Sequence, residues 1–176
     1  MNAITIENLT KKYENTVAVD NLNLTIKQGE LFALLGGNGA GKTTTIKMLS
    51  CLIKPTSGDA YLLSDSITSN PHTIKKKINI SPQETAVAAN LSVLENLKLI
   101  AGIYGQDSKT ANKNAHEIAC KFGLEQELNK KAKNLSGGMQ RRLSIAMALI
   151  SEPQILFLDE PTLGLDVLAR RELWAS

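Results

Sequence analysis

Alternating apolar and polar positions near the start of the chain predict two half-buried strands. Residues 3–9 alternate in this way, and residues 17–26 do so again, which is the period-two pattern of strands with one buried face. Together the two segments predict a small antiparallel sheet. Residues 31–35 instead form a short continuous apolar run that ends at Gly36, which predicts a strand buried on both faces in a parallel sheet.

Apolar residues at helical spacing predict several helices after this run. The first predicted helix starts near Gly41 and carries Ile46, Leu49 and Ile53 on one face. Four further helices are predicted at residues 92–104, 110–122, 136–150 and 167–174. Ser92 and Glu95 have the spacing of a capping box, in which each side chain satisfies a free amide of the first turn. Gly123 follows residue 122 at a typical C-cap position. The middle of the chain is therefore predicted to be mainly helical.

Short apolar segments between the helices complete an α/β arrangement. Residues 60–63, 78–81 and 155–158 are predicted strands, and residues 54–58 are a predicted turn. A strand, a glycine-rich loop, a helix and a later buried strand predict a doubly wound α/β core. The chain has 176 residues and is 43% hydrophobic, which is enough for one domain with a sizeable core.

The glycine-rich segment at residues 36–43 satisfies the pattern GxxxxGK[ST] between a predicted strand and a predicted helix. Glycines let the backbone curl so that its amides point at phosphates, and the helix N-terminus adds a positive end. Lys42 is expected to reach the β- and γ-phosphates, and the Thr43 hydroxyl to ligate magnesium. The predicted binding residues are Gly36, Gly37, Asn38, Gly39, Ala40, Gly41, Lys42, Thr43 and Thr44. Because kinases, GTPases and motor proteins share this loop, it indicates only a nucleoside-triphosphate site.

Two adjacent carboxylates, Asp159 and Glu160, follow the predicted strand at residues 155–158. The carboxyl end of a buried strand is where Asp159 can hold magnesium through water. Glu160 is placed to polarise a water for in-line attack on the γ-phosphorus. Taken alone, these residues fit equally well as the polar end of a strand, and the nearby phosphate loop favours the catalytic interpretation.

The segment at residues 135–140 contains Ser136 followed by Gly137 and Gly138. The serine can cap the helix that follows, and the glycines leave its first-turn amides uncovered, which predicts a second anion-binding helix end. Together with the phosphate loop, the strand that ends in two carboxylates and their spacing, this segment resembles the signature of the ATP-binding cassette (ABC) family. The resemblance covers essentially the whole chain.

The resemblance implies a P-loop NTPase (RecA-like) α/β fold: a parallel-sheet core with an N-terminal antiparallel β subdomain and a helical subdomain that carries the signature. Residues 1–176 are interpreted as a single ABC ATPase domain, with an approximate helical subdomain at residues 84–150 inserted in the α/β core. Members of this family pair head to tail. Ser136, Gly137 and Gly138 are thereby implied to contact the γ-phosphate held by a second ABC ATPase subunit, in a homodimer, and a monomer is expected to be inactive.

Other positions resemble further family motifs. Tyr13 resembles the aromatic residue that stacks on adenine, and an ordinary half-exposed tyrosine is the alternative. Gln83 resembles the Q-loop glutamine, which touches magnesium and the attacking water, and Asp166 resembles the D-loop residue that crosses to the other subunit. The implied catalytic residues are Glu160, Lys42 and Gln83, and the implied metal ligands are Thr43, Gln83 and Asp159.

The chain departs from the family pattern at two places. The second phosphate-loop position, usually proline, is Gly37, which costs preorganisation because glycine has more unfolded freedom to lose. The chain also ends before the position of the switch histidine, and neither His72 nor His116 can replace it by position. A truncated domain that binds MgATP and hydrolyses it slowly is therefore expected.

Charge and composition limit the kinds of partner that the chain is expected to bind. There are 20 basic and 17 acidic side chains, an excess too small to indicate nucleic acid, and no direct nucleic-acid contact is expected. Cys51 and Cys120 match no metal or redox spacing. The N-terminus lacks the pattern of a signal peptide, and no apolar run reaches the roughly 20 residues of a membrane span. Any membrane role is therefore expected to depend on a partner chain.

The favoured function is the ATP-binding and ATP-hydrolysing subunit of an ABC transporter. Its cofactors are expected to be ATP and Mg²⁺, and an integral-membrane permease would hold it on the cytoplasmic face of the cell membrane. Residues 161–174 look most like the cassettes of bacterial exporters. The alternative is a soluble ABC-type ATPase that acts on ribosomes or nucleic acid, although no long coiled-coil insertion separates Lys42 from Ser136.

Overall fold

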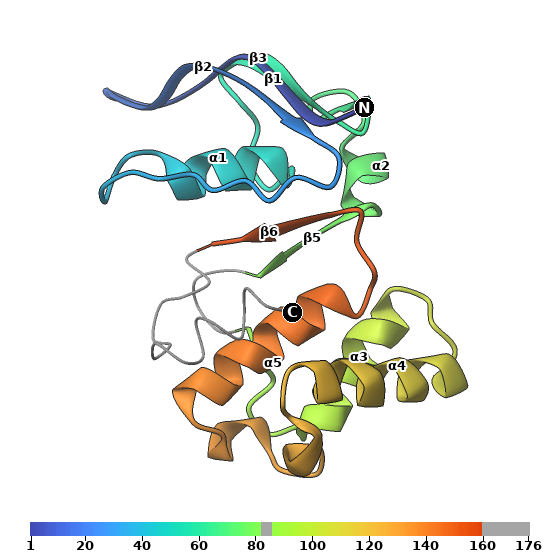
Figure 1. The fold of residues 1–176 in the computed structure, drawn as a ribbon. Coiled ribbons are helices and arrows are strands. Elements are labelled where there is room, and N and C mark those ends of the chain that lie inside the picture. The colour runs from blue at the N-terminus through green and yellow to red at the C-terminus, as the bar shows by residue number, and fades with distance from the viewer. Residues whose placement is uncertain (82–85, 160–176) are drawn as a thin grey trace. The chain divides into compact units, whose positions relative to one another are not determined.

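The computed structural model describes residues 1–81 and 86–159, and the chain divides into two compact units, Met1–Ile78 and Asn79–Ser176 (Figure 1). That residues 1–176 make a single domain stays a prediction. The predicted helix at residues 167–174 and the positions of Gln83, Glu160 and Asp166 lie outside the described residues.

The first unit contains the predicted antiparallel sheet. Its strands are β1 (Asn2–Tyr13), β2 (Thr16–Lys27), β3 (Ser57–Leu62) and β4 (Asp65–Ser66), in the order β2-β1-β3-β4. All the adjacent pairs are antiparallel, and β1 at the centre pairs Ile4 with Ile26 on one side and with Leu62 on the other. Alternate apolar residues of β1 are buried, as the period-two pattern requires. The prediction of an antiparallel sheet is confirmed.

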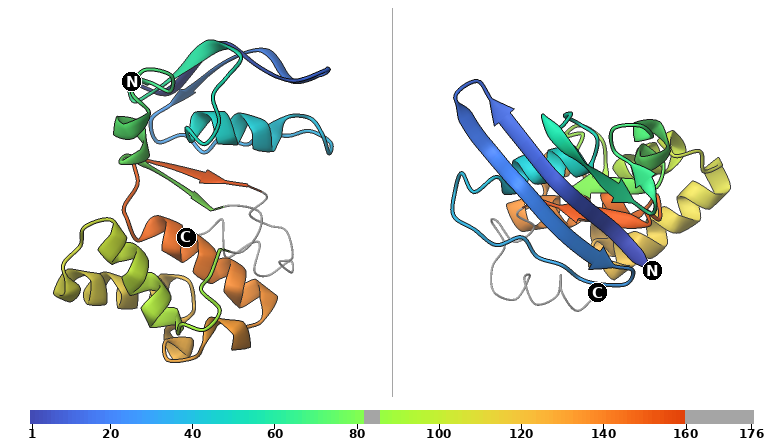
Figure 2. Two further views of the ribbon diagram at one scale, coloured as in Figure 1. Left: turned by 180° about the vertical axis from the view of Figure 1, so that it is seen from behind. Right: turned by 90° about the horizontal axis from the view of Figure 1, so that it is seen from above.

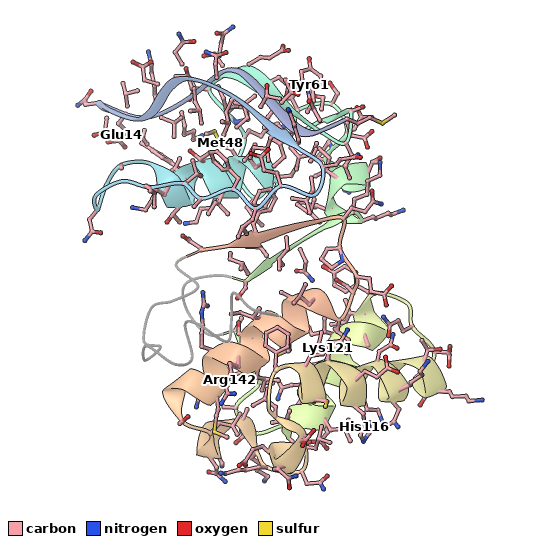
Figure 3. All side chains as sticks on the ribbon, viewed as in Figure 1. Glu14, Met48, Tyr61, His116, Lys121 and Arg142 are labelled. Atoms are coloured by element: carbon pink, nitrogen blue, oxygen red, sulfur yellow. The ribbon has the colours of Figure 1, made fainter. Side chains whose placement is uncertain are left out.

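Helix α1 (Lys42–Leu49) runs along one face of this sheet, and the short α2 (Pro71–Lys75) follows β4 (Figures 1 and 2). Met48, labelled in Figure 3 between α1 and the sheet, is fully buried. The helix is shorter than predicted, because Ser50 caps it and Cys51 takes a left-handed φ of 57°. Ile53 therefore lies beyond the helix, and the prediction that it shares a helix face with Ile46 and Leu49 was wrong.

The strand predicted at residues 31–35 is absent from the described part of the chain, where these residues form no sheet pairing. Leu31 is 79% exposed and Leu35 is 91% exposed. The physical reason is that an apolar run indicates a preference for burial but does not supply a hydrogen-bonding neighbour, which a strand requires. These residues pair with no described strand, so the prediction of a strand buried on both faces was wrong here.

The second unit is mainly helical, as predicted. It contains α3 (Val93–Ile103), α4 (Ser108–Lys121), α5 (Gly137–Leu149) and two short 3₁₀ turns at Glu125–Glu127 and Ala132–Asn134. Apolar side chains from all three helices form one buried cluster that includes Leu97, Ala115, Leu124, Leu143 and Ile145. Strands β5 (Ile78–Ser81) and β6 (Ile155–Leu158) form a two-stranded sheet, and their arrows run in the same direction (Figure 1).

The helix caps follow the local sequence closely. Ser92 and Glu95 make both bonds of the predicted capping box, since the Glu95 amide donates to Ser92 Oγ at 3.2 Å and the Ser92 amide to Glu95 Oε2 at 2.7 Å. These bonds with Ser92 lower the pKa of the Glu95 carboxyl. Helix α4 starts two residues earlier than predicted because Asp107 caps it. Gly123 takes a φ of 61°, the left-handed conformation of a glycine C-cap.

No helix in the described ranges, 1–81 and 86–159, is long and apolar enough to cross a lipid bilayer.

Candidate functional site

The glycine-rich loop before α1 depends on its glycines for different physical reasons. Gly39 and Gly41 have φ values of 82° and 80°, which side-chain-bearing residues rarely adopt. A Cβ on Gly41 would also lie 2.3 Å from the Ala18 carbonyl oxygen of β2. A Cβ on Gly36 would lie 2.9 Å from Ala40 Cβ. The conformation of this loop therefore depends on a left-handed backbone at Gly39 and Gly41 and on close approaches at Gly36 and Gly41.

This backbone leads directly into the start of α1. Gly41 is the N-cap residue, and it has no side chain with which to cap the helix. Its carbonyl accepts from the Thr45 amide at 2.8 Å and from Thr45 Oγ1 at 3.0 Å, which fixes the first turn. Residues 36–41 are at least partly accessible, and Thr43 and Thr44 are half-buried in the first helical turn. The loop and helix start thus provide an accessible positive helix end, which suits an anion.

The Lys42 side chain folds back over the loop that precedes it. Its ammonium group donates to the Gly36 carbonyl at 2.6 Å and to the Gly37 carbonyl at 3.0 Å. The Ala40 amide in turn donates to the Gly37 carbonyl at 3.2 Å. These bonds hold a positive charge beside the loop, where it can reach a phosphate that the loop amides bind. The role of Lys42 in binding the β- and γ-phosphates stays a prediction.

Tyr13 ends β1 at the tip of the β1–β2 hairpin and is 47% exposed. The ammonium group of Lys11 lies 5.1 Å from the centroid of its ring. The hairpin tip, near the labelled Glu14, and the loop before α1 lie at the same end of the first unit (Figures 1, 2 and 3). An exposed aromatic ring and the accessible N-terminal end of α1 therefore share one end of this unit.

Asp159 follows β6 in the second unit and is only 6% exposed. Its amide donates to the Ser81 carbonyl at 3.0 Å, which continues the β5–β6 pairing to the strand end. Asp159 therefore stands at the carboxyl end of a strand, as predicted. Only Phe157 of that strand is buried and the other three residues are half-buried, so the prediction of a fully buried strand was wrong.

Arg141 on α5 is a residue that the sequence analysis missed. It is 4% exposed, and its Nη2 donates to the Asp159 carbonyl at 2.8 Å. Burial lowers the pKa of the Arg141 guanidinium, and the Asp159 carboxylate acts in the opposite direction. Arg141 shares a helix face with Ser144, Ile145 and Ala148, which are all buried. This spacing was the available signal, because it placed an arginine on the core-facing side of a predicted helix.

Ser136 caps α5 as predicted, since its Oγ accepts from the Met139 amide at 3.2 Å. Ser136 and Gly137 are exposed and Gly138 is half-buried. A Cβ on Gly137 would meet no atom within 4 Å, so the glycine leaves open space beside the helix start. The helix start predicted at Ser136 is therefore present and accessible, and its binding of an anion stays a prediction.

The predicted metal ligands are hard oxygen donors. Among the described residues, no group of three or more His, Cys, Asp or Glu side chains could hold a metal ion. The Thr43 hydroxyl and the Asp159 carboxylate nevertheless fit Mg²⁺, which keeps several waters and takes its remaining ligands from one or two carboxylates and from phosphates. Thr43 lies in the first unit and Asp159 in the second.

Comparison with protein families and curated proteins adds independent evidence. The family model described as ABC transporter matches residues 19–163. The daunorubicin/doxorubicin resistance ATP-binding protein of Streptomyces peucetius is 40% identical over 98% of this chain, which covers 52% of that protein. A probable multidrug ABC transporter ATP-binding protein of Escherichia coli K12 is 39% identical over 97% of this chain and 30% of that protein. The chain thus spans about half or less of the length of these relatives.

Solved structures also match. A dimeric bacterial ABC transporter cassette superposes with a TM-score of 0.89 at 31% identity, covering 98% of this chain and 80% of that one. A dimeric post-hydrolysis state of an ATP-binding cassette, bound to ADP and Pi, gives a TM-score of 0.88 at 31% identity with the same coverage. These matches show that the chain has the P-loop NTPase fold with an antiparallel β subdomain.

Proposed function

The chain belongs to the ABC transporter family, and from this premise we propose that it binds MgATP and hydrolyses it to drive a transporter. The observation that carries the proposal is the loop before α1, where left-handed glycines, an uncapped helix start and the Lys42 ammonium group surround one accessible anion site. Backbone amides and a helix N-terminus bind phosphates in this way. Tyr13, exposed at the same end of the unit, supplies a ring on which adenine stacks.

The catalytic assignment follows the chemistry of the side chains. Lys42 binds the β- and γ-phosphates, and Glu160 takes the proton of the attacking water while Gln83 orients that water. Thr43, Gln83 and Asp159 are the residues that would hold Mg²⁺, which neutralises charge on the phosphates when bound. Arg141 supports this set, because its bond to the Asp159 carbonyl fixes the backbone that carries the carboxylate.

We assign the second helix end to a partner subunit's nucleotide. Ser136, Gly137 and Gly138 form an accessible helix start with open space beside Gly137. The two matching cassette structures are dimeric, which supports a head-to-tail homodimer in which each chain completes the site of the other. In this arrangement residues 1–176 act as one cassette domain, with residues 84–150 as its helical subdomain.

The relatives favour an exporter. They are named for daunorubicin and doxorubicin resistance, for multidrug transport and for Nod factor export. The chain would then sit on the cytoplasmic face of the membrane, bound to an integral-membrane permease that determines the transported substrate.

Titration of the protein with ATP and Mg²⁺ in a calorimeter, followed by a phosphate-release assay, tests the proposal. We expect saturable binding and turnover by the unmodified chain with its permease. Glu160→Gln should bind ATP with unchanged affinity and lose at least about 100-fold in turnover, the size of a general-base effect. A folded protein that gives no heat with ATP would overturn the nucleotide site, and full turnover by Glu160→Gln would overturn the base assignment.

A further inference from the structure

We propose that Lys11 is a positioning residue for adenine recognition, whose ammonium group holds and polarises the Tyr13 ring on which the base stacks. The inference rests on the proposed function, because the base concerned is that of the bound ATP. It adds a residue that acts on the nucleobase end of the site through another side chain.

The ammonium group of Lys11 is held at two points. It lies 5.1 Å from the centroid of the Tyr13 ring, within the roughly 6 Å over which a cation is attracted to a ring face. It also donates to the Lys54 carbonyl at 2.8 Å. Lys11 and Tyr13 lie two residues apart at the end of β1. The cation is therefore fixed over the ring by a second bond to the main chain.

Hydrogen bonds connect the strand that carries Lys11 to the segment that follows α1, the helix after the phosphate loop. The Lys12 amide donates to Thr56 Oγ1 at 3.0 Å, and the Thr56 amide donates to the Thr10 carbonyl at 2.8 Å. These bonds join β1 to the segment that follows α1. At the other end of α1, Gly41 packs closely against the Ala18 carbonyl of β2. The β1–β2 hairpin therefore contacts the chain at both ends of α1, the helix that follows the phosphate loop.

A cation on one ring face changes the other face. Tyr13 is 47% exposed, and Lys11 occupies one side of its ring, so the base has the opposite side on which to stack. The positive charge draws π-electron density toward itself and reduces the repulsion that opposes stacking on the far face. Holding the ring still also lowers the ordering cost of binding. Both effects favour a stacked base, and neither requires Lys11 to touch the nucleotide.

Lys12 provides a matched control. It carries the same charge one residue along β1 and its side chain is exposed, whereas the cation over the Tyr13 ring is that of Lys11. If Lys11 acted only as one more positive charge that attracts phosphates, Lys12 would act similarly. A positioning role predicts that only Lys11 matters, and that it matters only to ligands that carry a base.

The test measures the dissociation constants of ATP and of inorganic triphosphate, both with Mg²⁺, for the full chain and its Lys11→Met, Lys11→Arg and Lys12→Met variants. We expect Lys11→Met to weaken ATP binding about two- to fivefold, the size of an exposed cation–π interaction. Its affinity for triphosphate should stay unchanged. Lys11→Arg should restore ATP binding because arginine also places a cation over a ring, and Lys12→Met should bind both ligands normally.

A second background separates positioning from other effects. In Tyr13→Ala, the further change Lys11→Met should have no effect on ATP binding, because no ring remains to be held. An effect that persists there, or an equal loss of triphosphate affinity in Lys11→Met, would overturn the role of Lys11 while leaving the proposed function standing. An unmodified chain that binds neither ATP nor triphosphate would instead overturn the proposed function, and the role of Lys11 with it.

Discussion

Helices α1 and α5 both begin beside glycines, yet they start in different ways. At α1 the N-cap is Gly41 with a φ of 80°, no side-chain cap and a backbone pressed against β2. At α5 the N-cap is Ser136, whose hydroxyl satisfies the Met139 amide, and Gly137 has open space around it. The first helix start takes its shape from the packing of its backbone, and the second takes its shape from a local side-chain cap.

This difference suits two different tasks. The start of α1 carries its own cation, Lys42, beside the loop, so it can hold a phosphate without another group. The start of α5 is capped by the neutral Ser136 hydroxyl, and the Arg141 guanidinium of this helix is buried against the Asp159 carbonyl. An accessible, locally stable helix end with a neutral cap suits the completion of a site that another chain holds. Substitutions at matched positions can break or sharpen this comparison.

The largest expected effect is at the glycines themselves. In Gly41→Ala the new Cβ would lie 2.3 Å from the Ala18 carbonyl, at a φ that alanine disfavours, so unfolding by urea should show a loss of about 3 kcal/mol or more. Gly137→Ala should change stability by less than about 0.5 kcal/mol, because its Cβ meets no atom within 4 Å. Equal losses in the two variants would contradict the contrast between the two helix starts.

The second-largest effect is expected from removal of the Lys42 ammonium group at the start of α1. Lys42→Ala is expected to weaken MgATP binding by roughly 100-fold, because it deletes a charge-assisted hydrogen bond to phosphate. Lys47→Ala is the control, since Lys47 carries the same charge on the exposed side of the same helix. Calorimetric titration of both variants decides the matter. Similar affinities would show that Lys42 acts only through the overall charge of the unit.

The contrast between the helix starts also shows how far sequence alone could reach. The capping box at Ser92 and the serine cap at Ser136 were predictable because both partners of each bond lie within three residues. The close approach of Gly41 to Ala18 was not, since it depends on how α1 packs against a strand more than twenty residues earlier. Local hydrogen bonds can be derived from spacing, and packing between distant segments cannot.

The same distinction explains the strand that was predicted wrongly and the residue that was missed. Residues 31–35 have the apolar composition of a buried strand, but the pattern contains no information about a pairing partner. Arg141 has the spacing of a core residue, but its partner is the carbonyl of Asp159, 18 residues away. The roles of Gln83 and Glu160 stay predictions, because these residues lie outside the described part of the chain.

A smaller effect is expected at the cap of α5. Ser136→Ala should lower stability by about 1 kcal/mol, the usual cost of losing a serine N-cap, because the Met139 amide loses its acceptor. Ser136→Asp should restore stability, since aspartate caps equally well. ATP binding to a single chain should not change in either variant, because this helix end is assigned to the partner's nucleotide. A single-chain binding defect in Ser136→Ala would argue against that assignment.

The smallest effects are expected at Gly37 and Gly39 in the loop before α1. They separate the cost of a left-handed backbone from the cost of steric contact. Neither Gly37 nor Gly39 would bring a Cβ within 4 Å of another atom, yet only Gly39 has a left-handed φ, at 82°. Gly37→Ala should therefore raise stability by about 0.4 to 1 kcal/mol by restricting the unfolded chain, with MgATP affinity retained. Gly39→Ala should instead lower stability by about 1 kcal/mol. Thermal unfolding of the pair measures both signs in one experiment. A loss in Gly37→Ala as large as that in Gly39→Ala would mean that the whole loop, and not its left-handed positions alone, requires glycine.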